Sequence, residues 1–207
     1  MKRLFDLVGA SVGLLVLSPL FAVVAILIKR DSRGPVFFKQ QRVGRHFRPF
    51  WIYKFRTMTP DARLKGSLLT VGEDPRITRV GRFLRRAKLD ELPQLINIVK
   101  GEMSFVGPRP EVTRYVELFR GEYSEILQVR PGMTDLASLK YRDESTLLAS
   151  SMTPEEEYIT HILPDKLRLG RQYVRELSLV RDVTLIARTV AAIVRPAHVV
   201  PNLKSEN

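Results

Sequence analysis

Twenty-two consecutive residues without a charge, from Leu7 to Ile28, constrain this chain more than any other feature. As a straight helix they would reach about 33 Å, enough to cross a hydrocarbon core of roughly 30 Å. Fourteen of them are Leu, Ile, Val or Phe, and a buried core helix rarely runs so far without a polar face. The run is too long for a signal peptide and lacks a small-residue cleavage site before Lys29. It predicts a membrane-inserted helix.

Two details bear on how this helix inserts. Ser18-Pro19 lies near its middle, where the proline removes a hydrogen bond and clashes with the Leu15 carbonyl; this predicts a kink that Ser18 can satisfy locally. Basic residues flank both ends, with Lys2-Arg3 before the run and Lys29-Arg30 and Arg33 after it. A spanning helix would place one cluster outside, against the positive-inside tendency, whereas a bent, re-entrant helix keeps both on the cytoplasmic side. Spanning stays open, and re-entry is favoured.

Positive charge is concentrated in the first half of the chain. The formal net charge is +12, and residues 1–109 carry 21 Lys and Arg against 8 Asp and Glu, whereas residues 110–207 carry 13 against 14. A solvated surface usually mixes its signs, so the first half is expected to face an anionic partner. We expect that partner not to be nucleic acid, because no recognised binding motif is present and the apolar run would be unexplained. Cysteine is absent, which excludes disulfides and thiolate metal sites.

Secondary-structure signals predict an α+β protein that is mainly helical and has one small β-hairpin. The β-favouring runs 36–38 and 50–53 are joined by a polar stretch, and Trp51 is expected in the core, with an interfacial anchor as the alternative. We expect a membrane anchor at 1–28 and one further domain at 29–207, which form one structural unit; the residues described below predict that this domain is catalytic. Helices are expected at Arg76–Lys88, at Val112–Leu127, from Thr153-Pro154 onward, at Lys166–Glu176 and at Asp182–Val194. Pro196 and Pro201 are expected to end regular structure, and residues 59–74 to form a connection.

The stretch Lys88–Pro110, KLDELPQLINIVKGEMSFVGPRP, contains two adjacent carboxylates, Asp90 and Glu91. They are expected to open a helix that runs from residue 92 to about 99, with Asp90 as its N-cap and Gly101 at its end. Helix N–H groups would then favour a bound anion and lower the pKa of the Asp90 carboxyl. A structural cap and an active site are equally open at this point.

Basic residues around the carboxylate pair suit a phosphate. Arg109 stands between two prolines of fixed φ, so its guanidinium hangs on stiff backbone and can match phosphate oxygens. Arg85, five residues before Asp90, belongs to a run with arginines at helical spacing. Hard oxygen ligands suit Mg²⁺, and a carboxylate nucleophile can divide phosphoryl transfer into two displacements. These residues indicate chemistry on a phosphate at a membrane.

Three motifs resemble the bacterial sugar transferases known as monotopic phosphoglycosyl transferases. They are IYKFRTM at 52–58, LDELPQL at 89–95 and MSFVGPRP at 103–110. The resemblance extends from Ser18-Pro19 to the Leu-Ser-x-x-x-Asp of residues 177–182. It implies transfer of a sugar-1-phosphate from a UDP-sugar to undecaprenyl phosphate, giving a lipid diphosphate-sugar and UMP. It also implies a re-entrant anchor at the cytoplasmic face of the bacterial inner membrane, in contact with membrane lipids, and a role in glycoconjugate assembly.

The resemblance assigns roles to individual residues. Asp90 would be the nucleophile that forms a phosphosugar-aspartate, and Glu91 its partner, which assists the carrier phosphate or the metal. Mg²⁺ would be held at Asp90 and Glu91. Contacts to phosphates or to the nucleotide would come from Lys54, Arg85, Arg109 and Arg142.

The loop RPGMTDLASLKYR, residues 130–142, departs from the family pattern. Asp135 replaces a glycine and Lys140-Tyr141 replaces Asn-Gly, so the role of Arg142 and the choice of sugar are open here. A basic membrane adaptor without catalysis is the alternative from another class, but it leaves the carboxylate pair and Arg109 without a purpose. An oligomer also stays open, although the GxxxG pair at Gly9 and Gly13 is weak evidence for a dimer.

Overall fold

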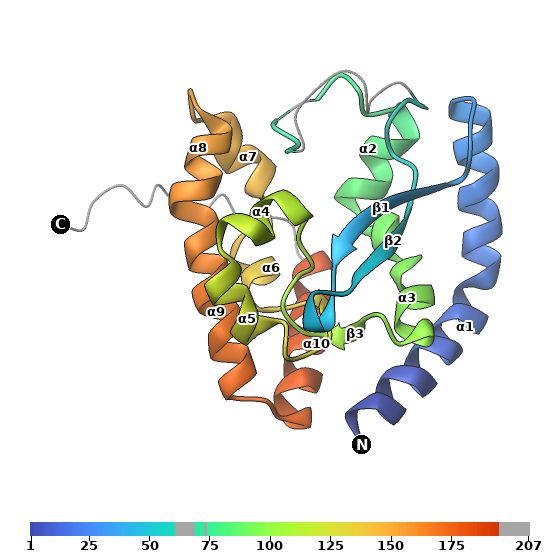
Figure 1. Cartoon of the computed structure of the whole chain (residues 1–207). Coiled ribbons are helices and arrows are strands. Elements are labelled where there is room, and N and C mark those ends of the chain that lie inside the picture. The colour runs from blue at the N-terminus through green and yellow to red at the C-terminus, as the bar shows by residue number, and fades with distance from the viewer. Residues whose placement is uncertain (61–68, 73, 195–207) are drawn as a thin grey trace.

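The computed structural model describes residues 1–60, 69–72 and 74–194. One long helix, α1 (Lys2–Asp31), lies along one side of a mainly helical body, which confirms the α+β class (Figure 1). The remaining elements are β1 (Phe37–Val43), β2 (Pro49–Phe55), α2 (Arg79–Arg86), α3 (Gln94–Lys100), β3 (Ser104–Val106), α4 (Thr113–Leu118), α5 (Arg120–Ile126), β4 (Gly132–Thr134), α6 (Leu136–Lys140), α7 (Glu144–Ala149), α8 (Pro154–Glu157), α9 (Leu163–Arg175) and α10 (Leu179–Val194).

Helix α1 carries the apolar run and is long and apolar enough to cross a membrane by length and composition. It stays one helix through Pro19, and Figure 1 shows its N-terminal part set at an angle to the rest. The hydroxyl of Ser18 donates to the Leu15 carbonyl at 2.8 Å. That carbonyl would have received the N–H that proline lacks, so the predicted local compensation is confirmed.

The two glycines of the GxxxG pair face the body of the same chain. A Cβ at Gly9 would lie 2.9 Å from the ring of Phe105, and one at Gly13 would lie 3.3 Å from Leu95. Glycine at these positions therefore lets α1 approach β3 and α3 closely. The motif is used for packing within the chain.

Strands β1 and β2 form the predicted antiparallel hairpin, in register from Phe37 opposite Phe55 to Val43 opposite Pro49. Each strand has seven residues, so both are longer than the runs that signalled them. On β2, Phe50 and Ile52 are buried, whereas Trp51 between them is 52% exposed. The core prediction for Trp51 is wrong because strand side chains alternate between faces. Its role as an interfacial anchor stays a prediction.

A second sheet, of two short parallel strands, was not predicted. Strands β3 and β4 pair with Ser104 opposite Gly132 and Val106 opposite Thr134. A Cβ at Gly132 would lie 2.1 Å from the backbone nitrogen of Gly107, so only glycine permits this approach. Three-residue strands are too short to show a period in the sequence, and residues 130–142 had been identified only as a loop.

Most predicted helices are present, but several differ in their bounds or continuity; α9 and α10, for example, each begin three residues earlier than expected. The helix expected at 112–127 is two helices, α4 and α5, because the backbone leaves helical geometry at Phe119 (φ −125°, ψ 41°). Helix α2 begins at Arg79, later than predicted, since the Thr78 side chain accepts the Gly81 N–H at 3.0 Å and caps it. Helix α8 begins at Pro154 as expected. Most of the 59–74 connection and the tail beyond residue 194 lie outside the described residues.

Candidate active site

All six residues singled out for phosphate chemistry line one cavity of about 1400 Å³. They come from β2, from α2 and the turn after it, from the segment after β3 and from the segment after α6. These residues are Lys54, Arg85, Asp90, Glu91, Arg109 and Arg142. The fold thus brings together side chains that are separated by up to 88 positions in the sequence.

The carboxylate pair lies on a single 3₁₀ turn, Leu89–Glu91. Helix α3 follows and ends at Gly101, which has φ 82° as expected of a glycine C-cap. The prediction that Asp90 is the N-cap of this helix is wrong, because α3 starts only after Pro93 and no side chain caps it. Lys88, just before the turn, adopts a left-handed conformation (φ 55°), and residues 88–92 line the cavity.

Glu91 is held by two cations. Lys54 Nζ donates to its Oε1 at 2.7 Å, and the guanidinium of Arg109 bonds both carboxylate oxygens, with Nη1 at 3.3 Å from Oε2. Burial alone would raise the pKa of Glu91, but the charges and hydrogen bonds of Arg109 and Lys54 outweigh it. The pKa of Glu91 therefore lies well below its ordinary value, and that of Arg109 is raised by the Glu91 charge.

Asp90 has the opposite environment. Its side chain is 7% exposed and has no hydrogen-bond or ion-pair partner in the part of the chain that the structure describes. Burial raises the pKa of this carboxyl, and the nearby Lys54 charge only partly offsets that rise. The expected lowering by helix N–H groups is wrong because Asp90 caps no helix. Of the two neighbours, Asp90 is the desolvated, unengaged carboxylate.

Arg109 is fixed at its backbone as well as at its guanidinium. Its N–H donates to Asp135 Oδ2 at 3.0 Å, while Asp135 Oδ1 accepts the N–H of Ser138 at 2.6 Å and caps α6. Sequence reasoning noted Asp135 only as a departure from the family pattern. An N-cap signal was available there, since an aspartate precedes the helix-favouring run at 136–140.

The remaining cations lie around the same cavity. Arg85 donates to the hydroxyl of Thr70 at 3.0 Å, and its Nη1 is buried without a hydrogen-bond partner among the described residues. A buried unpaired donor at a cavity wall is suited to an anionic ligand. Arg142 also lines the cavity and is half-buried.

The carboxylate pair offers few ligands for a metal ion. Within the described residues, no group of three or more His, Cys, Asp or Glu side chains could enclose a metal ion. Glu91 is engaged by two cations, which leaves Asp90 as the open carboxylate of the pair. This arrangement fits Mg²⁺ bound through one carboxylate and substrate phosphate oxygens, because Mg²⁺ commonly binds in this way.

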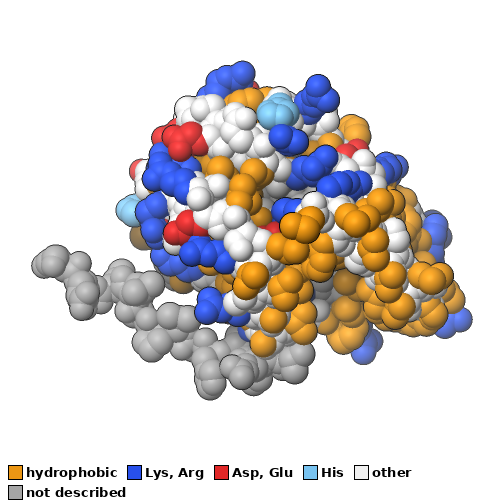
Figure 2. Space-filling model, turned by 90° about the horizontal axis from the view of Figure 1, so that it is seen from below, with side chains coloured by type: hydrophobic (Ala, Val, Ile, Leu, Met, Phe, Trp, Pro, Cys, Tyr) orange, Lys and Arg blue, Asp and Glu red, His pale blue; other side chains and the backbone are white. Residues whose placement is uncertain are grey.

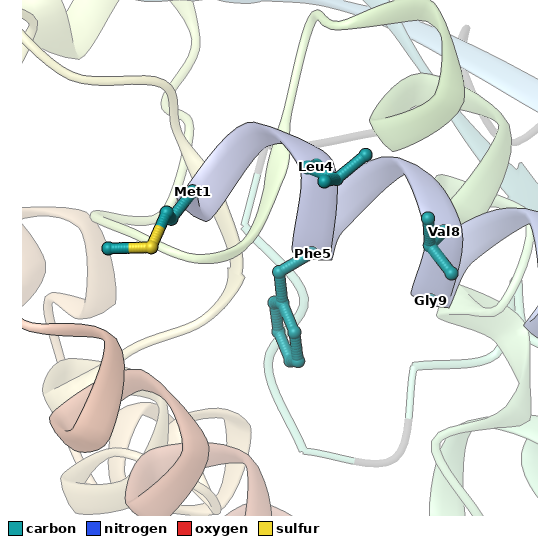
Figure 3. A pocket seen from close by; sticks show the side chains of 5 residues that line it. All are labelled: Met1, Leu4, Phe5, Val8 and Gly9. Carbon is teal, nitrogen blue, oxygen red and sulfur yellow. The ribbon is translucent and has the colours of Figure 1, made fainter.

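The cavity changes character toward α1 and α10. There it is lined by uncharged side chains, namely Gly9, Gly13, Leu17, Phe105, Met133, Ile186, Val190 and Ile193. Figure 2 shows hydrophobic side chains gathered on this underside of the molecule, with lysine and arginine around their edge. A smaller apolar hollow of about 410 Å³ lies at the start of α1, lined by Met1, Leu4, Phe5, Val8 and Gly9 (Figure 3). One end of the main cavity is thus charged and the other apolar.

Comparison with known proteins agrees with the motifs. The family model described as bacterial sugar transferase matches residues 1–196. The exopolysaccharide production protein ExoY of Rhizobium meliloti is 37% identical over 207 residues, covering 93% of this chain and 84% of that protein. The UDP-glucose:undecaprenyl-phosphate glucose-1-phosphate transferase of Caulobacter vibrioides is 36% identical over 197 residues, covering 93% and 69%. The exopolysaccharide production protein PSS of Rhizobium leguminosarum is 47% identical over 148 residues, covering 68% and 74%.

Proposed function

The chain belongs to the bacterial sugar transferase family, and from this premise we propose that it transfers a sugar-1-phosphate from a UDP-sugar to undecaprenyl phosphate. The observation that carries the proposal is the composition of the main cavity. Its charged end suits the diphosphate of a UDP-sugar, and its apolar end between α1 and α10 suits a prenyl chain. A lipid phosphate consists of a charged phosphate and an apolar chain, so its binding site must offer both environments next to each other. The similar proteins named above act on undecaprenyl phosphate or take part in exopolysaccharide production.

The reaction proceeds in two displacements. An oxygen of Asp90 forms a bond to the β-phosphorus of the UDP-sugar while the bond from that phosphorus to the bridging oxygen breaks, and UMP leaves with the bonding electrons. A phosphate oxygen of undecaprenyl phosphate then bonds to the same phosphorus, and the Asp90 oxygen departs as a carboxylate. The product is undecaprenyl-diphosphate-sugar, which places the enzyme at the first membrane step of glycoconjugate assembly.

The structure supports Asp90 as the nucleophile on two grounds. Its carboxylate has no partner to displace among the described residues, whereas attack by Glu91 would require breaking its bonds to Lys54 and Arg109. Its raised pKa makes the ionised carboxylate more basic. Burial also removes the water that would solvate the carboxylate and weaken its attack. Glu91 holds Arg109 and Lys54 at the cavity wall, where their charges face the transferring phosphoryl group. Mg²⁺ bound at Asp90 and the substrate phosphates would neutralise charge on the diphosphate.

The N-terminal end of α1 is held to the rest of the protein by hydrogen bonds and an ion pair. Lys2 donates to the Val106 carbonyl at 3.1 Å and forms an ion pair with the buried carboxylate of Asp182 in α10. Asp6, one turn later and 1% exposed, accepts the Ser104 hydroxyl at 3.0 Å. The start of the helix therefore rests on β3 and α10.

The other end of α1 is bonded to the same body. Asp31 accepts the Val80 N–H of α2 at 3.1 Å, and Arg56, the residue after β2, donates to the Ser32 carbonyl at 2.8 Å. If α1 spanned a bilayer with both ends so attached, the polar groups of the body would have to enter the hydrocarbon, which is costly. These contacts support a re-entrant, monotopic anchor, and the basic residues that flank both ends of the apolar run favour the cytoplasmic face of the bacterial inner membrane.

The test is intact-mass measurement after incubation with a panel of UDP-sugars in the presence of Mg²⁺. Wild type incubated with an accepted UDP-sugar alone should release UMP and gain a sugar-phosphate adduct, and Asp90→Asn should do neither. UMP release only after undecaprenyl phosphate is added would instead favour direct transfer. A non-catalytic adaptor would release no UMP from any UDP-sugar under either condition.

A further inference from the structure

Asp135 is a buried carboxylate that joins two separate parts of the cavity wall. Asp135 is only 4% exposed. One oxygen accepts the backbone N–H of Arg109 at 3.0 Å, and the other accepts the N–H of Ser138 at 2.6 Å. The first bond reaches 26 positions along the chain, to a residue that contacts Glu91. The second stays local and caps α6.

The position of the bond between the Arg109 N–H and Asp135 explains why a side chain must supply the acceptor. The segment after β3 runs beside the end of β4, where the Gly107 N–H donates to the Thr134 carbonyl at 3.1 Å. Pro108 has no N–H, and beyond Thr134 the chain turns into α6. The backbone of β4 therefore offers no further acceptor, and the next donor on the facing segment, the Arg109 N–H, is taken by the Asp135 side chain.

We propose that Asp135 is a positioning residue that sets the backbone of Arg109, and through it the guanidinium that contacts Glu91. The inference rests on the proposed function, which it deepens by adding a residue that acts through Arg109. The arginine side chain is long, so a small rotation of its backbone moves the guanidinium by ångströms. Misplacement of about 1 Å at a reacting centre can cost on the order of 10²-fold in rate.

One substitution can remove the bond from Asp135 to Arg109 and keep an N-cap for Ser138. In Asp135→Ser the hydroxyl remains an effective helix N-cap for Ser138, because serine is among the preferred N-cap residues. Its shorter side chain cannot also reach the N–H of Arg109. Asp135→Asn, which keeps the volume but offers one acceptor in place of two, is the second variant if the serine variant does not fold.

Hydrogen exchange measures the bond directly, since Arg109 is the only residue of Pro108-Arg109-Pro110 with a backbone amide. In the full-length protein in detergent, we expect the Arg109 amide to exchange at least tenfold faster in Asp135→Ser. Amides of 136–140 should keep their protection. Ser138→Ala is the matched control, because it leaves both donors and Asp135 in place and should not change exchange at Arg109. Unchanged exchange at Arg109 in Asp135→Ser would overturn the proposal.

A double-mutant cycle then separates positioning from a general effect on folding. We expect Asp135→Ser to lower kcat/KM for UMP release at least tenfold in the wild-type background and less than threefold in the Arg109→Ala background. An equal loss in both backgrounds would overturn the proposal, because Asp135 would then act independently of Arg109. If wild type releases no UMP, the proposed function fails, and the exchange measurement still decides whether Asp135 holds Arg109.

Discussion

Neutralising each carboxylate of the pair should change stability in opposite directions. Glu91 is the partner of two cations and is only 15% exposed. Removing one member of such a buried pair typically costs 3–5 kcal/mol, so Glu91→Gln should lower the free energy of unfolding by about 3 kcal/mol. For a chain of this length that corresponds to a fall of roughly 6–12 °C in Tm. Asp90 has no hydrogen-bond or ion-pair partner within the described part of the chain, and burial raises its pKa. Asp90→Asn should therefore stabilise the fold at pH 7, by about 1 kcal/mol.

The sign of the Asp90 effect depends on pH. Because the pKa is raised in the folded state, the ionised carboxylate destabilises the fold above that raised value. The penalty disappears as the pH falls below the ordinary aspartate value of about 4, where folded and unfolded chains are both protonated. The Tm gain of Asp90→Asn should accordingly be present at pH 7 and absent near pH 4.

Thermal unfolding of the detergent-solubilised protein, followed by far-UV circular dichroism, measures these changes. Glu117→Gln is a matched control, since Glu117 pairs with Arg120 on the surface, where both side chains are more than half exposed. It should shift stability by less than about 0.5 kcal/mol. A lower Tm for Asp90→Asn at pH 7, or no loss of Tm for Glu91→Gln, would refute the assigned environments.

Four further outcomes are expected. The acid limb of UMP release should lie above about pH 4, because burial raises the pKa of Asp90 and only the carboxylate attacks; a limb at or below that value would contradict the burial argument. Excess EDTA should abolish turnover, and Mg²⁺ should restore it; full activity in EDTA would exclude a divalent ion. Gly132→Ala should destabilise by about 3 kcal/mol or more because its Cβ meets backbone at 2.1 Å, whereas Gly121→Ala, with nothing within 4 Å, should be neutral or stabilising. Single cysteines at Lys2 and Arg33 should both label only from the cytoplasmic side, and labelling of position 2 from outside would indicate a spanning helix.

The sequence alone determined those features that depend on neighbouring residues. The uncharged run at 7–28 predicted the long helix α1, and Ser18-Pro19 predicted a local bond that the structure contains. The hairpin and the C-terminal helices followed from period and from turn residues. The motif around Asp90 and Glu91 identified the region of the cavity. In each case the determining forces act within a few positions of the chain.

Tertiary structure decided how the two carboxylates differ. Glu91 obtains its partners from Lys54 and Arg109, which lie 37 and 18 positions away. The local sequence predicted that Asp90 is a helix cap with a lowered pKa. The fold instead places it on a 3₁₀ turn, where it is buried, has a raised pKa and is unpaired among the described residues. The same holds for Asp135, whose bond to Arg109 spans 26 positions. A pKa depends on burial and on charges within a few ångströms, and the order of residues along the chain contains neither quantity until the fold brings distant segments together.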